Sequence, residues 1–283
     1  MGICCSQDGQ RFECAIKLRH GTRCLSFQEK KESFVEGDIN EWIKDIFSKK
    51  WDNWLCYNDQ TESPSSTKAH AKGILVWNES RFGWLIHSVP HFPSSYDGKT
   101  ISDIAKSELL YGQSFFYIER SFEGLTLDQL FHQLCIMDVH AMLTNDTAFN
   151  RKREEYKKHN NIHHLQVLIL DPIMIHIAKS LNHLIDIYSH YLIPQYKHKW
   201  LVQTWKRGHI IQESCRYIED VCSMKWGSET FLSSQDHSKI AVSEKGYVWV
   251  GDLNRMTSQY QRGGGGIVFQ HEKLALAIRN WFQ

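Results

Sequence analysis

Two short motifs place a histidine two residues before a lysine: His70 with Lys72 in the first half of the chain, and His237 with Lys239 in the second. Residues two apart in an extended strand lie on the same face, so each pair can point at one spot. A histidine beside a fixed cation suits chemistry on an anion such as phosphate. The lysine neutralises oxygen charge, and the imidazole attacks or transfers a proton near neutral pH. One such motif is common by chance, so the second copy is what makes the pattern informative.

Further polar residues follow the second motif. Asp252, Asn254 and Arg255 come at the end of an apolar run, and a run of glycines begins at Gly263. Asn254 either belongs to the site or caps a turn. Asp252 can pair with Arg255 at the surface, so we leave it out of the catalytic set. The glycine run lacks the Lys-Ser/Thr ending of a P-loop, and we expect it to serve backbone conformation or close backbone approach.

The composition predicts one large domain or two closely packed halves, because 283 residues with 42% apolar content can bury a substantial core. The formal net charge of +1 excludes steering to nucleic acid by net charge, although a local groove can still be basic.

No run approaches the roughly 18 apolar residues of a membrane span, and the first residues lack a secretory signal pattern. The opening Met1–Ser6 fits a myristoylation pattern. A chain trimmed so that it begins with Met would look the same. The eight cysteines show no zinc-site spacing, so we expect no tetrahedral metal centre.

Apolar periodicity places the motifs on strands interleaved with helices. Lys72–Val89 predicts strand, turn and strand, with His87 near its end either packed or part of the site. The polar, basic stretch Asn150–His164 is either an exposed loop or helix face, or a phosphate-contacting surface. We further predict strands at Phe12–Leu18, Trp51–Asn58, Ser114–Ile118, Leu165–Leu170 and Leu201–Trp205, and the second HxK strand with its hairpin partner within Gln235–Val250. Helices are predicted at Ile39–Phe47, Leu125–Leu143, Pro172–Tyr191 and His271–Phe282.

Each half of the chain therefore carries one motif on an apolar strand. This pattern predicts an α/β pseudodimer with approximate halves 1–150 and 151–283. Because no low-complexity linker separates the halves, we expect residues 1–283 to form one compact unit.

Several stretches resemble the deoxyribonuclease II family of the phospholipase D-like superfamily. The resemblance covers most of the chain and is weakest between about residues 120 and 165. It is carried by His70-Ala71-Lys72-Gly73, by Gly83 to Pro93 with its His-Ser-Val-Pro, by Tyr111-Gly112-Gln113, by Asp236 to Gly265 with its Gly-Asp-Leu-Asn-Arg, and by Tyr57-Asn58-Asp59-Gln60, Lys17-Leu18 and Ile177-Ala178-Lys179, the last expected in a helix.

The resemblance implies a fold and an activity. The fold is a phospholipase D-like α/β pseudodimer: two mixed β-sheets flanked by helices, with one HxK motif per half. The activity is an endonuclease that cuts DNA at acidic pH and leaves 3′-phosphate ends, with no cofactor and no metal ion. The implied partners are the DNA substrate and, in some assemblies, a second copy as a homodimer.

The resemblance also implies roles. One histidine attacks phosphorus to give a phosphohistidine, while the other protonates the leaving oxygen and later activates water. We assign His70 as nucleophile and His237 as acid, with an exchange of roles left open. One neutral and one charged histidine fit a reaction favoured at mildly acidic pH. The implied site residues are His70, Lys72, His237, Lys239, His87 and Asn254.

The chain departs from the family pattern in three respects. Ala241, Val250 and Tyr117 stand where the family tends to have cysteine, which predicts a disulfide framework with fewer or rearranged bonds. The chain is also short for the family. The family is lysosomal or secreted, whereas the missing signal pattern leaves an intracellular alternative. Two other functions stay open: a degenerate DNA-binding homologue, against which the intact motifs argue, and a phosphodiesterase acting on RNA or phospholipid, against which His-Ser-Val-Pro argues.

Overall fold

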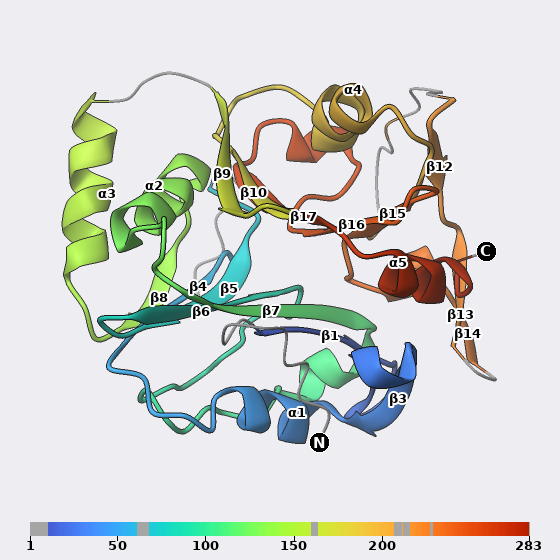
Figure 1. Cartoon of the computed structure of the whole chain (residues 1–283), viewed down its shortest axis with the longest axis horizontal. Helices are drawn as coiled ribbons and strands as arrows, with labels where there is room; N and C mark the ends of the chain where they lie inside the picture. Colours follow the sequence, from blue (N-terminus) through green and yellow to red (C-terminus); the bar gives the residue numbers. More distant parts are fainter. Residues whose placement is uncertain are drawn as a thin grey trace.

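A computed structural model describes residues 11–60, 68–159, 164–206, 211, 216–226 and 229–282. The predicted myristoylation pattern at Met1–Ser6 lies outside these residues. Two large β-sheets lie one above the other, with helices on their outer faces and at their ends (Figure 1). Within the described part of the chain, no helix is long and apolar enough to cross a membrane.

The first sheet is built from the N-terminal part of the chain. Among the described residues it has eight strands in the order β3-β2-β1-β7-β6-β5-β4-β8, and every neighbouring pair is antiparallel. The hairpin predicted at Lys72–Val89 is confirmed as β5 and β6. The strands are β1 (Arg11–Lys17), β2 (Arg23–Gln28), β3 (Ser33–Asp38), β4 (Asn53–Asn58), β5 (Lys72–Trp77), β6 (Arg81–His87), β7 (Gln113–Ser121) and β8 (Ala141–Thr144).

The second sheet is built from the C-terminal part. In the described ranges it has seven strands in the order β12-β11-β15-β16-β17-β10-β9, antiparallel except for the parallel pair of β11 and β12. A separate hairpin pairs β13 with β14. The strands are β9 (Leu165–Asp171), β10 (Met174–Lys179), β11 (Trp200–Gln203), β12 (Ile218–Asp220), β13 (Ser223–Trp226), β14 (Glu229–Leu232), β15 (Ile240–Ser243), β16 (Tyr247–Gly251) and β17 (Gly264–Gln270).

Five strands of each sheet share one arrangement. The order β1-β7-β6-β5-β4 in the first sheet matches β10-β17-β16-β15-β11 in the second, with antiparallel pairing throughout. In both sets the strands also follow the same order along the chain. Each HxK motif lies at the start of the corresponding strand: Lys72 is the first residue of β5, and Lys239 directly precedes β15.

An apolar core fills the space between the two sheets. Leu75, Trp84 and Phe116 enter it from the first sheet, and Ile267 and Phe269 enter it from the second. The rings of Phe116 and Phe269 stack with their centroids 4.7 Å apart. Because burial of apolar surface is the main favourable term in folding, this shared core makes each sheet depend on the other.

Short helices cover the outer faces of the sheets. On the first sheet, α1 (Ile39–Ile46) begins at Asp38, whose carboxylate accepts from the N–H groups of Asn40 and Glu41. On the second sheet, a π-helical turn at Tyr188–Leu192 leads into α4 (Ile193–Tyr196). The helix predicted at Ile39–Phe47 is confirmed, since one face buries Ile39, Ile43 and Ile46.

Two helices lie at one end of the sheets. A capping box of Thr126 and Gln129 starts α2 (Leu127–Met137), and α3 (Ala148–His159) packs against it. The polar stretch predicted at Asn150–His164 is thus mainly a helix. Two of its cations are paired with acids on α2 or at its end, Lys152 with Asp128 and Arg153 with Asp138.

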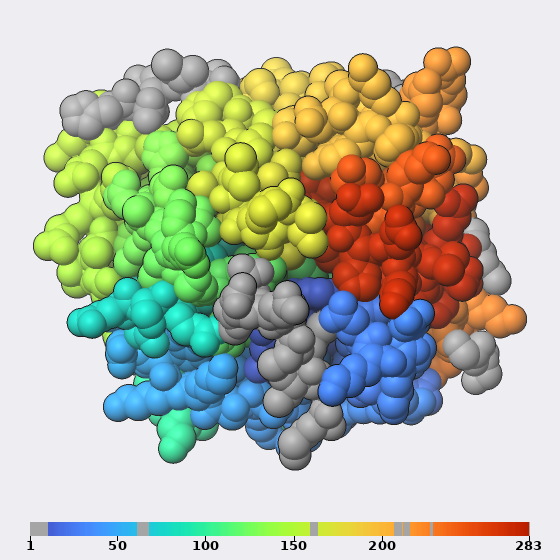
Figure 2. Space-filling view, viewed as in Figure 1, coloured from blue at the N-terminus to red at the C-terminus, as the bar shows by residue number. Residues whose placement is uncertain are grey.

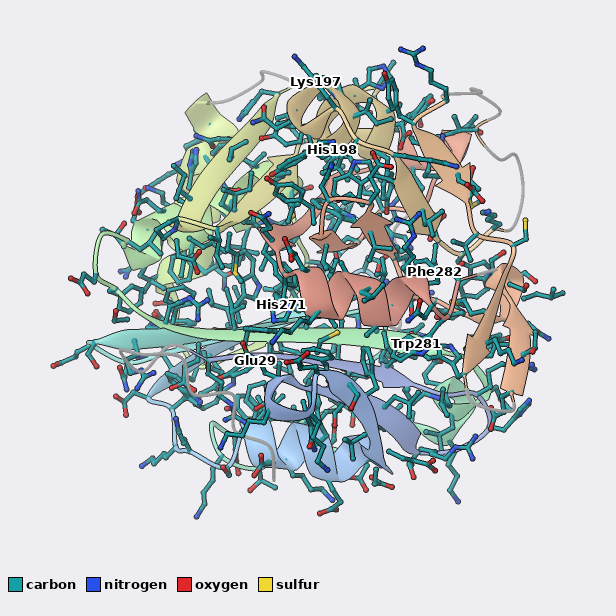
Figure 3. The ribbon with its side chains drawn as sticks, turned by 45° about the vertical axis from the view of Figure 1, so that its right-hand side comes forward. Glu29, Lys197, His198, His271, Trp281 and Phe282 are labelled. Carbon is teal, nitrogen blue, oxygen red and sulfur yellow. The ribbon has the colours of Figure 1, made fainter. Side chains whose placement is uncertain are left out.

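The C-terminal helix α5 (Glu272–Arg279) contacts both sheets, and confirms the helix predicted at His271–Phe282. Figure 3 shows His271 and Trp281 at the two ends of this helix, above the first sheet. The His271 ring meets Phe12 and Phe27, with centroids 5.2 and 5.4 Å apart. On this face of the molecule the C-terminal region sits directly on the N-terminal region (Figure 2).

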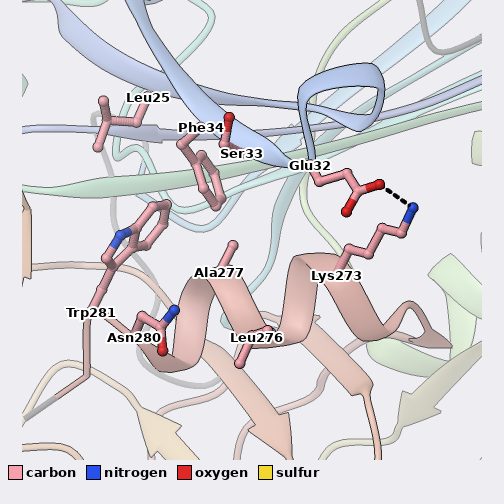
Figure 4. A pocket seen from close by; sticks show the side chains of 9 residues that line it. All are labelled: Leu25, Glu32, Ser33, Phe34, Lys273, Leu276, Ala277, Asn280 and Trp281. Carbon is pink, nitrogen blue, oxygen red and sulfur yellow. Dashed lines mark hydrogen bonds and ion pairs between the residues drawn. The ribbon is translucent and has the colours of Figure 1, made fainter.

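A surface groove of about 460 Å³ runs between α5 and strands β2 and β3 (Figure 4). An ion pair between Glu32 and Lys273 spans it. None of the six predicted site residues lines this groove, which is formed by Leu25, Glu32, Ser33, Phe34, Lys273, Leu276, Ala277, Asn280 and Trp281.

Two predicted helices are corrected. The helix predicted at Pro172–Tyr191 is wrong up to Asp186: β10 (Met174–Lys179) crosses the second sheet, a loop follows, and helical residues begin only at Ile187. This strand is covered on both faces, so its apolar residues do not alternate and their spacing mimics a helix. The helix predicted at Leu125–Leu143 ends at Met137, because Asp138 adopts a left-handed conformation and β8 follows.

The glycine run beginning at Gly263 lies against neighbouring backbone. A Cβ atom at Gly263 would sit 2.0 Å from the carbonyl oxygen of Met137, and one at Gly265 would sit 2.3 Å from that of Ile177. Backbone cannot move aside as a flexible side chain can. Close backbone approach, one of the two reasons expected from the sequence, is therefore confirmed at these two positions.

This packing predicts that Gly263→Ala lowers the free energy of unfolding by about 1–3 kcal/mol through overpacking. Urea denaturation followed by circular dichroism measures the change. Gly37→Ala is the matched control, since the nearest atom to its added Cβ would lie 3.9 Å away. Equal stability of the two variants would contradict the proposed clash.

Candidate active site

The first candidate histidine is held by residues from the second half of the chain. The backbone N–H of His70 donates to the carbonyl oxygen of Gly263 at 2.8 Å, and the ring Nδ1 of His70 lies 2.9 Å from the carbonyl oxygen of Asp252. A carbonyl oxygen only accepts, so Nδ1 carries a proton. In the neutral ring the lone pair is then on Nε2, which is the atom available for nucleophilic attack.

The second candidate histidine is held by residues from the first half. The backbone N–H of His237 donates to the carbonyl oxygen of Gly112 at 2.9 Å, and the ring Nδ1 of His237 lies 3.3 Å from Nε2 of Gln113. The Ser88 hydroxyl accepts from the Ser114 N–H and donates to Oε1 of Gln113, which directs the amide nitrogen towards His237. Nδ1 then accepts, and the neutral ring carries its proton on Nε2. Rotation of the amide would present Oε1 instead and suit the charged ring.

The two motifs are therefore brought together by reciprocal contacts between distant parts of the chain. They precede their strands rather than lying within them: His70 comes before β5, and His237 and Lys239 come before β15. This differs from the prediction that each pair shares the face of a strand. The strand starts still bring each histidine and its lysine to one end of the paired sheets.

Burial dominates the electrostatics of His70. It lowers the pKa of this histidine well below the usual 6.5, and the charges of Lys72, Lys239 and Arg262 act in the same direction. The Asp59 carboxylate opposes them in part. The neutral form of His70 is therefore favoured at mildly acidic pH.

Both lysines of the motifs are buried, with 2% of Lys72 and 3% of Lys239 exposed. Lys72 Nζ donates to Oδ1 of Asp59 at 2.5 Å, and Lys239 Nζ donates to the carbonyl oxygen of His237 at 2.6 Å. Burial lowers the pKa of Lys239 to about 7, and the charge of Lys72 adds to this effect. Two ammonium groups thus act on each other within one site, as an anion-binding site requires.

Two aromatic rings lie against His237. The centroid of Trp205 is 3.3 Å from that of the imidazole with planes 21° apart, and the centroid of Tyr111 is 4.6 Å away with planes 17° apart. Asn254 Oδ1 accepts from the backbone N–H of Trp205 at 3.1 Å. The structure thus links Asn254 to the histidine through Trp205.

A family model of deoxyribonuclease II matches residues 20–283. The chain belongs to the deoxyribonuclease II family. It is 32% identical to deoxyribonuclease-2 of Caenorhabditis elegans over 227 residues, which cover 74% of this chain and 59% of that protein. It is 30% identical to cell-death-related nuclease 7 of the same nematode over 287 residues, covering 90% and 77%. It is 30% identical to deoxyribonuclease-2-beta of Mus musculus over 252 residues, covering 81% and 70%.

The match confirms the family resemblance and the enzyme class, a deoxyribonuclease-type hydrolase. The chain spans less than two thirds of the nematode deoxyribonuclease-2. In this member of the deoxyribonuclease II family, the described cysteines are all free thiols: Cys14, Cys24, Cys56, Cys135 and Cys222.

Asp252 is a buried acid of the site, and its suggested surface pairing with Arg255 is wrong. Its Oδ1 accepts from the Lys72 N–H at 3.4 Å and its Oδ2 from the Gly265 N–H at 3.2 Å. Burial raises the pKa of Asp252 to about 7, although the charge of Lys72 opposes the shift. Arg255 instead pairs with Asp186 and Asp220.

His87 is packed at the end of β6. Its ring centroid lies 5.2 Å from that of Phe92 and 6.2 Å from that of Phe115, and its Nδ1 accepts from the Val89 N–H. Burial lowers the pKa of His87 to about 3, with a further contribution from the charge of Lys72. This histidine therefore lies within the electrostatic reach of the site as a neutral, packed group.

Sequence reasoning did not assign six residues that contact the motifs or hold the residues beside them. No spacing rule marks them, because they reach the site from four separate parts of the chain. Five of the six, all except Trp205, lie in stretches that carry the family resemblance, which was the one available signal. They are Asp59, Tyr111, Gln113, Trp205, Asp252 and Arg262.

These contacts predict that His70 stays neutral at pH 5.5 with its proton on Nδ1. Long-range ¹H–¹⁵N NMR spectra distinguish the two tautomers and the charged ring, and the His70→Gln variant assigns the signal. An imidazolium signal at that pH, or a proton on Nε2 of the neutral ring, would contradict the geometry.

Proposed function

We propose that this chain is a metal-independent endodeoxyribonuclease that hydrolyses DNA in mildly acidic conditions and leaves 3′-phosphate ends. The observation that carries the proposal is the reciprocal placement of two HxK motifs. Each histidine is fixed by the other half of the chain, and the two neutral rings carry their protons on opposite nitrogens. Family membership supports DNA as the substrate.

In the proposed first step, Nε2 of His70 attacks phosphorus and the bond from phosphorus to the 5′ oxygen breaks. His237 in its charged form gives a proton to that oxygen, and the Gln113 amide turns Oε1 towards Nδ1. The product is a phosphohistidine that carries the 3′ side of the DNA. Lys72 and Lys239 neutralise the non-bridging oxygens.

In the second step, the now neutral His237 takes a proton from water as the water oxygen attacks phosphorus. The bond from phosphorus to His70 breaks, which releases a 3′-phosphate and restores neutral His70. One proton has moved from His237 to the leaving oxygen and one has returned from water, so the histidines regain their starting states.

The electrostatics of the site support a preference for acidic pH. The lowered pKa of His70 keeps the nucleophile neutral below pH 6.5, because burial disfavours its charged form. Lys239, whose pKa burial lowers to about 7, is charged below that value and loses its charge above it. We therefore expect activity to fall as the pH rises through about 7.

We also propose that the fold is a phospholipase D-like pseudodimer with halves near 1–150 and 151–283. The repeated order of five strands, each set with one motif at the same place, supports this view. In this scheme Asn254 positions Trp205, and His87 is a neutral, packed group on which the charge of Lys72 acts. A lysosomal or secreted location and a homodimer are further proposals that rest on the family.

The first test is plasmid nicking in excess EDTA from pH 4 to 8 with wild type, His70→Ala and His237→Ala. We expect wild type to cut below pH 7 and each variant to lose at least about 10³-fold in rate, because each removes a group that reacts. His20→Ala is the matched control, since this histidine is exposed. Loss of wild-type cutting in EDTA, or full activity of either variant, would overturn the mechanism.

Product ends provide a second test. Fragments should resist extension by a DNA polymerase until a phosphatase removes the 3′-phosphate. Parallel reactions with RNA and with phospholipid vesicles separate the other phosphodiester substrates. Fragments with free 3′-hydroxyl ends would rule out the proposed bond cleavage.

A further inference from the structure

A buried carboxylate joins the first motif to the second half of the chain. Asp59 follows directly after β4 and is 6% exposed. Its Oδ1 accepts from Lys72 Nζ at 2.5 Å, and its Oδ2 accepts from Arg262 Nη2 at 2.8 Å. The preceding Asn58 anchors this segment, since its amide donates to two backbone carbonyls.

Arg262 grips the backbone that leads into His70. Its Nε donates to the carbonyl oxygen of Lys68 at 2.9 Å, and its Nη2 donates to that of Ala69 at 2.9 Å. The next residue, Gly263, accepts from the His70 N–H. Three consecutive residues before β5 are therefore bonded to two consecutive residues before β17.

Arg262 is itself fixed to the second sheet. Lys179, at the end of β10, is fully buried, and its Nζ donates to the carbonyl oxygens of Tyr260 and Arg262 at 2.9 and 2.5 Å. The contacts thus run from β10 through Arg262 to Asp59 and then to Lys72. Every group in this chain of contacts has a defined partner.

We propose that Asp59 and Arg262 act together as positioning residues for the first HxK motif. Asp59 holds the Lys72 ammonium in place, and Arg262 holds both Asp59 and the backbone before His70. This inference rests on the proposed function. Ordering a flexible lysine side chain costs rotamer entropy, so a fixed partner is needed to hold it in one position. A guanidinium fork can bind several acceptors in fixed geometry.

The competing explanation is an ion pair that serves stability alone, as many buried ion pairs do. Activity at matched stability separates the two explanations, and the charges around His70 supply a second readout. The charged groups that act on His70 are Lys72 on β5, Lys239 before β15, Arg262 before β17, and Asp59 after β4. The three cations lower the pKa of His70, and Asp59 raises it. Removing Asp59 or Arg262 therefore moves that pKa in opposite directions.

The experiment compares Asp59→Asn and Arg262→Gln with wild type in DNA cleavage across pH. We expect kcat to fall about 10- to 100-fold in each, with a smaller change in KM, because misplacement of reacting groups by about an ångström costs this much. The acidic limb of kcat/KM should move to lower pH in Asp59→Asn and to higher pH in Arg262→Gln. Arg262→Lys keeps the charge and loses the fork, so its kcat should fall without a shift of the limb.

Asp171→Asn is the matched control. Its partner Arg120 is also buried and also joins the two sheets, and the pair lies at the ends of β7 and β9 away from the motifs. We expect similar losses of stability in Asp59→Asn and Asp171→Asn, but lost activity only in the first. Shifts of the acidic limb in the same direction, or none in either variant, would overturn the inference.

NMR titration of His70 keeps the inference separate from the proposed function. If wild type leaves DNA intact, the proposed function fails. The titration still tests whether Asp59 and Arg262 act on His70. Opposite displacements of the His70 pKa in Asp59→Asn and Arg262→Gln would support the placement of these charges. Identical titrations in folded variants would refute it.

Discussion

Two buried ammonium groups set the main physical constraint on this protein. Lys72 and Lys239 are almost fully removed from water, and isolated charges in such surroundings are costly. Asp59 offsets part of this cost by an ion pair with Lys72, and Asp252 can do so only at a pH high enough to ionise it. The pKa of Asp252, raised to about 7, shows that burial outweighs the lysine charges there. A phosphate between the lysines would supply further negative charge, so this arrangement suits the proposed ligand.

The reciprocal contacts make the site a property of the whole chain. His70 depends on Asp252 and Gly263, and His237 depends on Gly112 and Gln113. The hydrogen bonds that fix each histidine thus come from the opposite half of the chain. Because the sheets also share one apolar core, loss of one half would remove both the fixed geometry of the site and the packing that supports it.

The sequence predicted the features that depend on local patterns. The β5–β6 hairpin and α1 follow from alternation and capping, and the two motifs indicated histidines that the structure holds by reciprocal contacts. It failed where both faces of an element are covered, as in β10, because full burial removes the periodicity. It also failed for contacts between distant residues. Asp59 and Arg262 lie 203 positions apart, and no local rule relates them.

The buried histidines carry a consequence for the stability of the protein in acid. His87 and His176 are both buried, and burial lowers their pKa values to about 3. Between about pH 6.5 and 3 these two histidines bind protons in the unfolded chain but stay neutral in the folded protein. Each can therefore raise the unfolding equilibrium constant up to about tenfold per pH unit. Asp252, with its raised pKa of about 7, works the other way as the pH falls, and offsets about one of them down to its unfolded pKa near 4. An acid environment that favours the proposed chemistry thus also weakens the contribution of these two buried rings to the stability of the fold.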